Sequence, residues 1–386
     1  MDRRHFIRLT AASGVAVAAA TGVGCSQQMP ADAIAAWQGP GAEADARRWI
    51  LAYAILAPHS HNLQSWLVDL HTQDEIVLRC DLTRLLPEAD PYSRQIMMSH
   101  GTFLELLDMA ARERGLRAEV SLFPEGAFGH SAIDQRPVAR IRLLADARVS
   151  KDPLFAQILS RRTNRNAYEL TRPVPADAWA AMAEGVKPNS LRFGFVGMDQ
   201  PDALRRHRAI AAEAWRIELT TPRTMMETYK VLRVGAAEIE QHRDGLFVLD
   251  SIPVLMSKMG LFDRSKPSAP GDYATTSQIK DFDAKLDSTP GFLWMVTDGN
   301  DRVTQVNAGR AYARVQLAAT AAGIALQPLQ QALQEYAEQA KPHAEIRSLL
   351  DASPPNRVVQ MWARAGFAPP VGPAPRRGVD AQLVRA

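Results

Sequence analysis

Apolar residues recur at helical spacing in several stretches of the chain. Over residues 46–56, Trp49 and Tyr53 fall on one face of a predicted helix. Ser99 is a candidate N-cap for a second helix, which ends at Gly115 because glycine readily terminates a helix. Further helices are expected over residues 153–161, 175–185, 202–217, 306–322 and 329–339.

Extended apolar runs predict strands between these helices. Residues 66–70 and 75–79 form a predicted strand pair, joined by a polar Thr-Gln-Asp turn. Residues 218–290 show no regular period, and their scattered Met, Pro and Gly residues predict an irregular segment. Further strands are expected over residues 118–123, 138–144, 191–196, 291–297 and 357–363.

The two halves of the chain share a repeated unit. Gly101 and Gly115 have the same separation as Gly309 and Gly323, and each pair encloses an Ala-Ala step at the matching position. Each unit is a helix with small residues, a terminating glycine and an extended segment. The shared order of elements predicts an internal duplication.

The composition excludes several classes of protein. The 386 residues are 46% hydrophobic and 23% charged, which excludes a disordered chain, a coiled coil and a polytopic membrane protein. Lys and Arg number 45 against 42 Asp and Glu, so the chain lacks the basic excess of a nucleic-acid-binding protein. Two cysteines, Cys25 and Cys80, exclude a disulfide scaffold and a multi-cysteine metal centre.

The first 28 residues resemble an export signal. Arg3 and Arg4 precede a Phe-Ile pair and an apolar stretch over residues 9–24, which is too short and too weakly apolar for a stable span. The pattern resembles a twin-arginine (Tat) signal, read by the Tat export machinery; an ordinary basic signal is the alternative. The Gly-Val-Gly-Cys sequence that ends at Cys25 resembles a lipoprotein box. We therefore expect a periplasmic or cell-envelope protein that contacts the membrane only through the signal or a lipidated Cys25.

An arginine-rich stretch follows the helix predicted over residues 153–161. Arg161, Arg162, Thr163 and Arg165 place three guanidiniums and a hydroxyl within five residues. Forked arginine donors match the oxygens of a phosphate, so this stretch is a candidate phosphate site. A solvated basic turn is the alternative.

A second polar cluster occupies residues 57–66, just before a predicted strand. Pro58, His59, Ser60 and Asn62 combine an imidazole, a hydroxyl and an amide with backbone N–H groups, a set of partners suited to a polar heterocycle. A metal site on the two histidines of this loop lacks a carboxylate at suitable spacing. A structural turn is the remaining alternative.

Together these clusters resemble those of the FMN-dependent nitroreductases. Residues 57–66 are similar to the family's AP-S-x-x-N-x-Q-P-W loop, and residues 161–165 to its R-R-S-x-R phosphate motif. The His-Asn pair at 61–62 resembles the Acg branch of that superfamily. The resemblance continues through Gly309–Gly323, the Gln-Pro-Leu-Gln-Gln sequence at 327–331 and the closing Pro-Arg-Arg.

The resemblance implies an α+β fold in which tandem duplicated halves form a pseudo-dimer, with mixed β-sheets flanked by helices. In ordinary nitroreductases the phosphate motif precedes the Pro-Ser loop and two subunits share each FMN, whereas here the loop comes first. The halves are then residues 46–150 and 151–386, after a linker over residues 29–45, and they hold one FMN in a monomeric chain. Residues 218–290 correspond to a lid-like insertion over the flavin; a mere surface insertion is the alternative.

The resemblance also implies which residues hold the FMN. Those for its phosphate are Arg161, Arg162, Thr163, Arg165, Arg376 and Arg377. Those that face the isoalloxazine or the ribityl chain are Pro58, His59, Ser60 and Asn62. Gln330 and Gln331 match the segment whose backbone N–H groups bond flavin N5 in relatives, although Gln331 replaces a glycine there. The resemblance names no catalytic side chain, and no metal is expected.

The implied function is an exported FMN-dependent oxidoreductase that reduces a small nitro or quinone-like electrophile. No Gly-rich dinucleotide fingerprint follows a strand, which is compatible with the resemblance because nitroreductases bind NAD(P)H only transiently against the flavin. The electron donor stays open because NAD(P)H is a cytoplasmic pool and the chain is expected to be exported. The alternative is an FMN-binding or sequestering protein whose covered flavin turns over little. A hydrolase is disfavoured, because the chain has no Gly-x-Ser-x-Gly elbow or His-Glu-x-x-His run.

Overall fold

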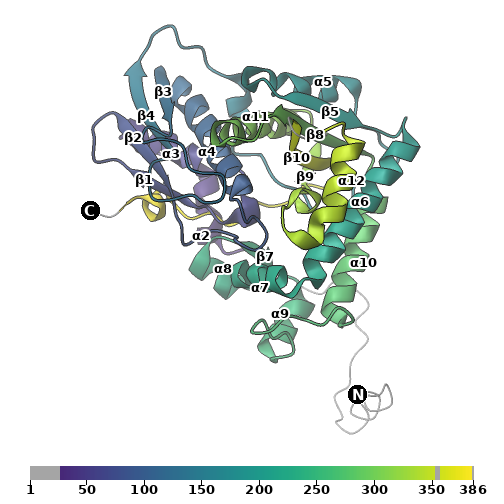
Figure 1. Cartoon of the computed structure of the whole chain (residues 1–386). Coiled ribbons are helices and arrows are strands. Elements are labelled where there is room, and N and C mark those ends of the chain that lie inside the picture. The colour runs from purple at the N-terminus through teal and green to yellow at the C-terminus, as the bar shows by residue number, and fades with distance from the viewer. Residues whose placement is uncertain (1–26, 353–356, 385–386) are drawn as a thin grey trace, which may run out of the picture.

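Two halves lie side by side in the fold, each with a four-stranded sheet and one long buried helix (Figure 1). The computed structural model describes residues 27–352 and 357–384. The predicted lipidation site Cys25 and all but the last two residues of the predicted export signal lie outside the described residues. In the part of the chain that is described, no helix is long and apolar enough to cross a membrane.

The first half carries an antiparallel sheet with the strand order β1-β2-β4-β3. β1 and β2 form the predicted strand pair, in which Trp66 pairs with Cys80. Burial alternates along β4, as expected for a sheet with one face on the core. The elements of this half are α2 (Ala31–Ile34), η1 (Ala35–Gln38), α3 (Ala46–Ala54), η2 (Ser60–Asn62), β1 (Trp66–Asp69), β2 (Glu75–Cys80), α4 (Arg94–Glu113), β3 (Leu116–Leu122) and β4 (Ala139–Ala145).

The second half carries the sheet β5-β8-β10-β9, which is also antiparallel. Its central strands β8 and β10 are buried along most of their length, because helices cover the sheet. The elements are η3 (Pro153–Gln157), α5 (Ala176–Glu184), η4 (Lys187–Asn189), β5 (Arg192–Val196), α6 (Pro201–Thr220), α7 (Pro222–Val231), β6 (Leu232–Val234), α8 (Ala236–His242), β7 (Leu246–Val248), α9 (Ser251–Lys258), α10 (Tyr273–Asp287), β8 (Gly291–Asp298), α11 (Arg302–Ala321), β9 (Ala325–Pro328), η5 (Gln331–Leu333), η6 (Ala337–Gln339), α12 (Ala340–Leu349), β10 (Arg357–Gly366) and η7 (Val379–Gln382).

The long helices α4 and α11 pack against each other where the two halves meet. A Cβ atom on Gly101 would lie 1.9 Å from the Val306 carbonyl oxygen, and one on Gly309 would lie 1.8 Å from that of Met98. Met98 and Val306 each precede the glycine of their own helix by three residues. The two contacts therefore exchange partners as in a symmetric dimer, in agreement with the predicted internal duplication.

The first residue of each long helix also crosses into the other half. Arg94 donates a hydrogen bond to the Val359 carbonyl at 3.0 Å, and Arg302 donates to the carbonyls of Gly129 and His130, both at 2.9 Å. Both guanidiniums are buried, where a charge-assisted hydrogen bond is strong and costly to lose. These bonds fix the relative position of the halves, between which the candidate site lies.

The C-terminal tail returns to the first half. The Val384 N–H donates to the Val68 carbonyl of β1 at 2.8 Å, and the Arg376 N–H donates to the Ala33 carbonyl at 2.7 Å. This path carries Arg376 from the end of the chain to the polar loop at residues 57–66.

The start of α4 differs from the prediction. The helix begins at Arg94, so Ser99 is not an N-cap but lies within the first two turns. There its Oγ donates to the Gln95 carbonyl at 2.7 Å, a bond that a serine inside a helix can make. The carboxylate of Asp90, which accepts from the Ile96 N–H at 3.1 Å, satisfies an early backbone donor instead.

Other segments also correct the predictions. Residues 218–290 are not irregular, because most of them lie in α6 to α10 with the short strands β6 and β7. The helix predicted over 329–339 is two 3₁₀ turns, and that over 153–161 is the shorter turn η3. The linker over 29–45 contains α2 and η1, and its Trp37 is buried. Both four-stranded sheets are antiparallel rather than mixed; the parallel strand pair is β6 with β7.

Candidate functional site

The predicted phosphate residues gather at the contact between the halves. Arg161 and Arg376 are both buried, although they lie far apart in the sequence. Burial lowers the pKa of Arg376 well below its ordinary value, and the charges of Arg161, Arg162 and Arg377 lower it further. The structure thus brings four of the predicted arginines within electrostatic range of one another.

Arg165 is the most informative member of the stretch. Its side chain is exposed to solvent, yet desolvation by surrounding protein lowers the pKa of its guanidinium. Solvent therefore reaches this side chain, although many protein atoms surround its guanidinium. Among residues 27–352 and 357–384, no hydrogen bond or ion pair engages this guanidinium. It is a desolvated cation that lacks an anion.

Arg161 is positioned by backbone and amide groups rather than by a carboxylate. It donates to the Gln316 side-chain oxygen at 3.1 Å and to the Leu56 carbonyl at 3.0 Å, while its Nε has no partner among the described residues. Gln316 on α11 also donates to Thr163 Oγ1 at 3.4 Å. Burial lowers the pKa of Arg161 to about 10. An anion would therefore be stabilised strongly here.

Trp37 is a residue of the site that the sequence analysis missed. Its ring lies 4.3 Å from the Arg162 guanidinium carbon, 5.4 Å from that of Arg161 and 5.7 Å from that of Arg376. Its indole N–H donates to the Ala374 carbonyl at 2.8 Å. The electron-rich face of an indole stabilises nearby cations, so Trp37 offsets part of their mutual repulsion.

The loop over residues 57–66 has an unusual backbone. His61, Asn62 and Gln64 adopt positive φ angles of 48°, 56° and 56°. Non-glycine residues occupy this region only when their surroundings hold them there. Arg376 does so in part, since it donates to the Asn62 side-chain oxygen and to the Ala57 carbonyl.

His59 closes the loop internally. Its Nδ1 lies 2.8 Å from the Ser60 carbonyl, and its Nε2 accepts from the Ser65 N–H at 3.1 Å. Burial lowers its pKa well below the ordinary value, so the ring is neutral. Both ring nitrogens are engaged, which leaves no lone pair for a metal, and no group of three metal-ligating side chains occurs among the described residues.

The remaining loop residues pack on α4 and the tail. The Ser60 N–H donates to Ser99 Oγ at 3.1 Å, and the Pro58 carbonyl accepts from Thr102 at 2.6 Å. Arg377 donates its backbone N–H to the Gln64 side-chain oxygen at 2.9 Å. α4 and the tail therefore fix the loop from two sides.

The segment between α8 and β7 lies directly on this loop. The Gly245 N–H donates to the Asn62 carbonyl at 3.1 Å, and Gln64 donates its amide to the Arg243 carbonyl at 2.9 Å. Between them, the buried Asp244 pairs with Arg233 at 2.8 Å. Part of the 218–290 insertion thus contacts the loop directly.

Glu218, near the end of α6, is a second site residue that the sequence did not reveal. Its carboxyl is buried, and Oε1 lies 3.9 Å from His61 Nε2, while Oε2 has no partner among the described residues. Burial raises the pKa of Glu218 to about 7, although the polar side chains of Gln331 and Gln334 oppose the shift. Burial lowers the pKa of His61 to about 4. Near neutral pH the His61 ring is therefore neutral, and the Glu218 carboxyl is the group of this pair that gains or loses a proton.

The side chains of the two predicted glutamines, Gln330 and Gln331, have different surroundings in the structure. Gln330 turns its side chain to β10, where it donates to the Gln360 carbonyl at 3.1 Å and accepts from the Trp362 N–H at 3.2 Å. The side-chain amide of Gln330 therefore binds β10 and is not available to a ligand. The Gln331 side chain instead influences the Glu218 carboxyl, whose pKa it lowers against the effect of burial.

Comparison with known proteins decides the family. The chain is 30% identical over 345 residues to the protein assigned as NAD(P)H nitroreductase Rv3131 of Mycobacterium tuberculosis strain H37Rv, with 87% of this chain and 90% of that protein covered. The protein assigned as NAD(P)H nitroreductase MT3217 of strain CDC 1551 matches equally well. The chain belongs to the nitroreductase family. No family model matches this nitroreductase.

Solved structures resemble this nitroreductase more distantly. The FMN-dependent nitroreductase NfnB of Mycobacterium smegmatis, solved with NADPH, is 18% identical; it covers 54% of this chain and 84% of its own, with a TM-score of 0.33. A nitroreductase structure from Anabaena variabilis is 9% identical; it covers 90% of this chain and 93% of its own, with a TM-score of 0.43.

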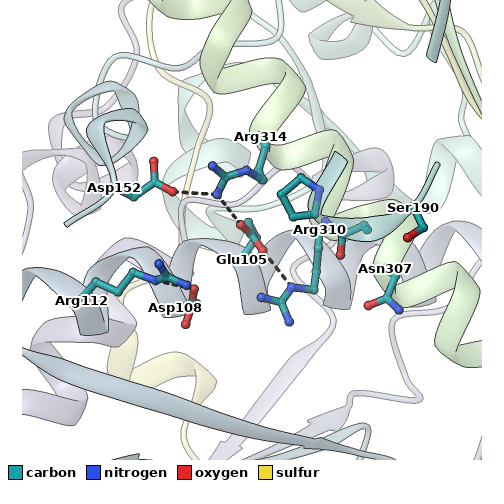
Figure 2. A pocket seen from close by; sticks show the side chains of 10 residues that line it. Glu105, Asp108, Arg112, Asp152, Ser190, Asn307, Arg310 and Arg314 are labelled. Atoms are coloured by element: carbon teal, nitrogen blue, oxygen red, sulfur yellow. Dashed lines mark hydrogen bonds and ion pairs between the residues drawn. The ribbon is translucent and has the colours of Figure 1, made fainter. Parts of the chain in front are cut away.

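A cavity of about 540 Å³ lies elsewhere on this nitroreductase, between α4, α11 and η4 (Figure 2). Glu105 accepts hydrogen bonds from Arg310 and Arg314, both at 2.8 Å, and Arg314 also donates to Asp152 at 2.7 Å. Asp108 likewise pairs with Arg112. Acidic and basic side chains balance in this cavity, whereas Arg165 has no ion-pair partner among the described residues, so the charges of the cavity pair with one another where the halves meet.

Glu218 gives the nitroreductase a pH-dependent stability. The carboxyl has an ordinary pKa of 4.5 when unfolded and a pKa of about 7 when folded. Between these values the unfolded chain loses the proton first, so the free energy of unfolding falls as the pH rises and is level above pH 7. Glu218→Gln removes this slope and stabilises the protein by about 3 kcal/mol at pH 8, with little effect below pH 4.

Urea denaturation from pH 4 to pH 8 measures this effect. Glu345→Gln is the matched control, because Glu345 is exposed and its loss leaves the wild-type slope. An unchanged slope in the Glu218→Gln variant would show that the carboxyl is not desolvated.

Proposed function

We propose that the chain holds one FMN between its halves and uses it to reduce a small electrophile, such as a nitro compound or a quinone. The observation that carries this proposal is the desolvated guanidinium of Arg165, which has no partner among the described residues and which, like the buried Arg161, interacts electrostatically with Tyr312. A phosphate, with its double negative charge and several acceptor oxygens, meets that demand better than a single carboxylate. The mycobacterial relatives, which bear the name of NAD(P)H nitroreductases, support the same reading.

The residues present fit the phosphate end of a flavin nucleotide. The Nε atoms of Arg161, Arg376 and Arg377 are buried and lack partners among the described residues. Such groups cost free energy unless a ligand or water accepts their hydrogen bonds. An anion between the halves supplies the missing acceptors and also lowers the repulsion among the guanidiniums.

Bound FMN would supply hydride transfer to and from its isoalloxazine ring. The chain's own residues then orient the cofactor and handle protons. Arg161 and Arg165 fix the phosphate, and the strained loop at residues 57–66 offers a preformed wall. Glu218 holds a proton near neutral pH beside Gln331, where a two-electron reduction needs one.

The proposal extends to cell location and donor. The twin-arginine pattern before residue 28 supports export of the folded chain with its cofactor already bound. The names of the relatives favour NAD(P)H as the donor in the cytoplasm, while an exported form depends on a donor of the cell envelope. The His-Asn pair of the loop supports the Acg-like branch.

A second function follows from the covered loop. Gly245 and Arg243 bond directly to Asn62 and Gln64, which places the insertion over the loop that would border the flavin. If this cover excludes substrates, the protein sequesters FMN and turns it over slowly.

Anaerobic addition of NADPH to the FMN-loaded chain separates the two functions. We expect the flavin band near ~450 nm to bleach, because the flavin accepts hydride. Bleaching by dithionite but not by NADPH would favour sequestration or another donor. A chain that takes up no FMN would contradict both.

A further inference from the structure

Within the described part of the chain, several strongly exposed large apolar residues gather on α9 and just after it. Ile252, Leu255 and Met259 are 68%, 58% and 62% exposed, and Leu261 in the turn that follows is 63% exposed. We name these four residues the α9 apolar face. Scattered exposed apolar residues are ordinary, but a group this exposed on one short element marks an interaction surface.

The large exposed apolar residues of α9 lie on the side of the helix that faces away from the body. Ile252, Leu255 and Met259 recur at a spacing of three and four residues, so they share the outer side of α9. Val254 faces inward and is only 5% exposed, with β6 next to the helix. The contact of Val254 with the body holds α9 in place, and the apolar residues on the outer side remain exposed. α9 projects from the body beside α7 and α8 (Figure 1).

The contacts of Gln27 show where the N-terminal segment meets the body of the protein. The Gln27 N–H donates to the Leu249 carbonyl at 3.0 Å, and the Gln27 side-chain oxygen accepts from the Ala236 N–H at 2.7 Å. Gln27 is thus attached two residues before α9 begins. The apolar stretch over residues 9–24 and Cys25 precede it directly in the sequence. The predicted export signal and the predicted lipidation site Cys25 therefore precede a point of attachment next to the α9 apolar face, which favours a bilayer as the partner.

We propose that the α9 apolar face docks on the surface of a lipid bilayer, with the N-terminal segment as its tether. A helix of this kind lies in the plane of the interface, with its apolar side among the acyl chains. Lys258, exposed at the end of α9, suits anionic headgroups. The inference is independent of the flavin site.

Binding of the full chain to phosphatidylcholine vesicles with one quarter phosphatidylglycerol tests this proposal. We expect Ile252→Ser with Leu255→Ser to weaken cosedimentation about tenfold or more, because two large apolar side chains lose their burial. The matched control is Leu170→Ser with Val303→Ser, since both residues are 41% exposed elsewhere on the surface. The control variant should bind as the wild type does.

Amide hydrogen exchange over residues 251–262 identifies what covers the face. Slower exchange only when vesicles are present supports the bilayer. Exchange that does not slow further when vesicles are added would overturn the proposal, because the N-terminal segment then covers the face already. Exchange that slows with rising protein concentration in the absence of vesicles would also overturn it, because a second copy then covers the face. Vesicle binding that is equal in both variants and the wild type would also overturn it.

Discussion

Replacing Arg165 with glutamine is expected to weaken FMN binding about a hundredfold to a thousandfold. The guanidinium has no protein partner among the described residues, so its loss breaks no internal contact of the fold. A charged hydrogen bond to phosphate contributes about 1.5–3 kcal/mol, and a forked pair contributes more. The dissociation constants of FMN and riboflavin, measured by flavin fluorescence, report the effect.

Riboflavin makes this result specific, because it lacks the phosphate. The wild type should bind FMN far more tightly than riboflavin, and the Arg165→Gln variant should lose about a hundredfold or more of this preference while its affinity for riboflavin stays the same. Arg148→Gln removes the same charge from a side chain that is 92% exposed, and it should keep the preference for FMN. If the Arg165→Gln variant still prefers FMN as strongly as the wild type, Arg165 does not hold the phosphate.

Replacing Gly309 with alanine is expected to destabilise the fold by about 3 kcal/mol or more. The new Cβ would lie 1.8 Å from the Met98 carbonyl oxygen, which is backbone and cannot turn away. Overpacking of this kind forces the two helices apart. Helix propensity alone predicts the opposite sign, since alanine favours a helix over glycine by about 1 kcal/mol. The sign of the change in unfolding free energy therefore decides between the two effects.

Urea denaturation of the Gly309→Ala variant supplies this sign. Gly129→Ala is the control, because no atom lies within 4 Å of its Cβ position, and its stability should stay close to that of the wild type. A Gly309→Ala variant as stable as the wild type would mean that α4 and α11 are not in such close contact. Because the halves meet along these helices, the variant should also bind FMN more weakly.

Local patterns predicted much of the fold. The strands over residues 66–70 and 75–79, and the repeated helices that end near Gly115 and Gly323, depend on period and on terminating residues that are adjacent in sequence. Such features depend on residues that are close in the sequence, so they can be predicted from it. The helix α6 was predicted, but α7 to α10 were missed because the Met, Pro and Gly residues scattered through this region obscured the pattern of its helices.

The sequence predicted the charged clusters of the candidate site but not the residues Trp37 and Glu218 that lie beside them. The clusters at 57–66 and 161–165 were visible as motifs, and the structure brings both to the contact between the halves. Trp37 and Glu218 had no such signal: one lies in a segment with a linker composition, and the other is an ordinary glutamate in sequence. Only the folded chain buries the carboxyl of Glu218 and places Trp37 among the arginines.

Titration of the cofactor-free full chain with FMN tests the central claim most directly. Absorbance and flavin fluorescence give the number of sites, and size-exclusion chromatography with light scattering gives the mass of the complex. Two fused halves with one site between them predict one FMN per chain in a monomer of 42.4 kDa. Saturation at one FMN per two chains, or only in a dimer, would contradict the fused site, and no uptake at all would exclude FMN as the cofactor.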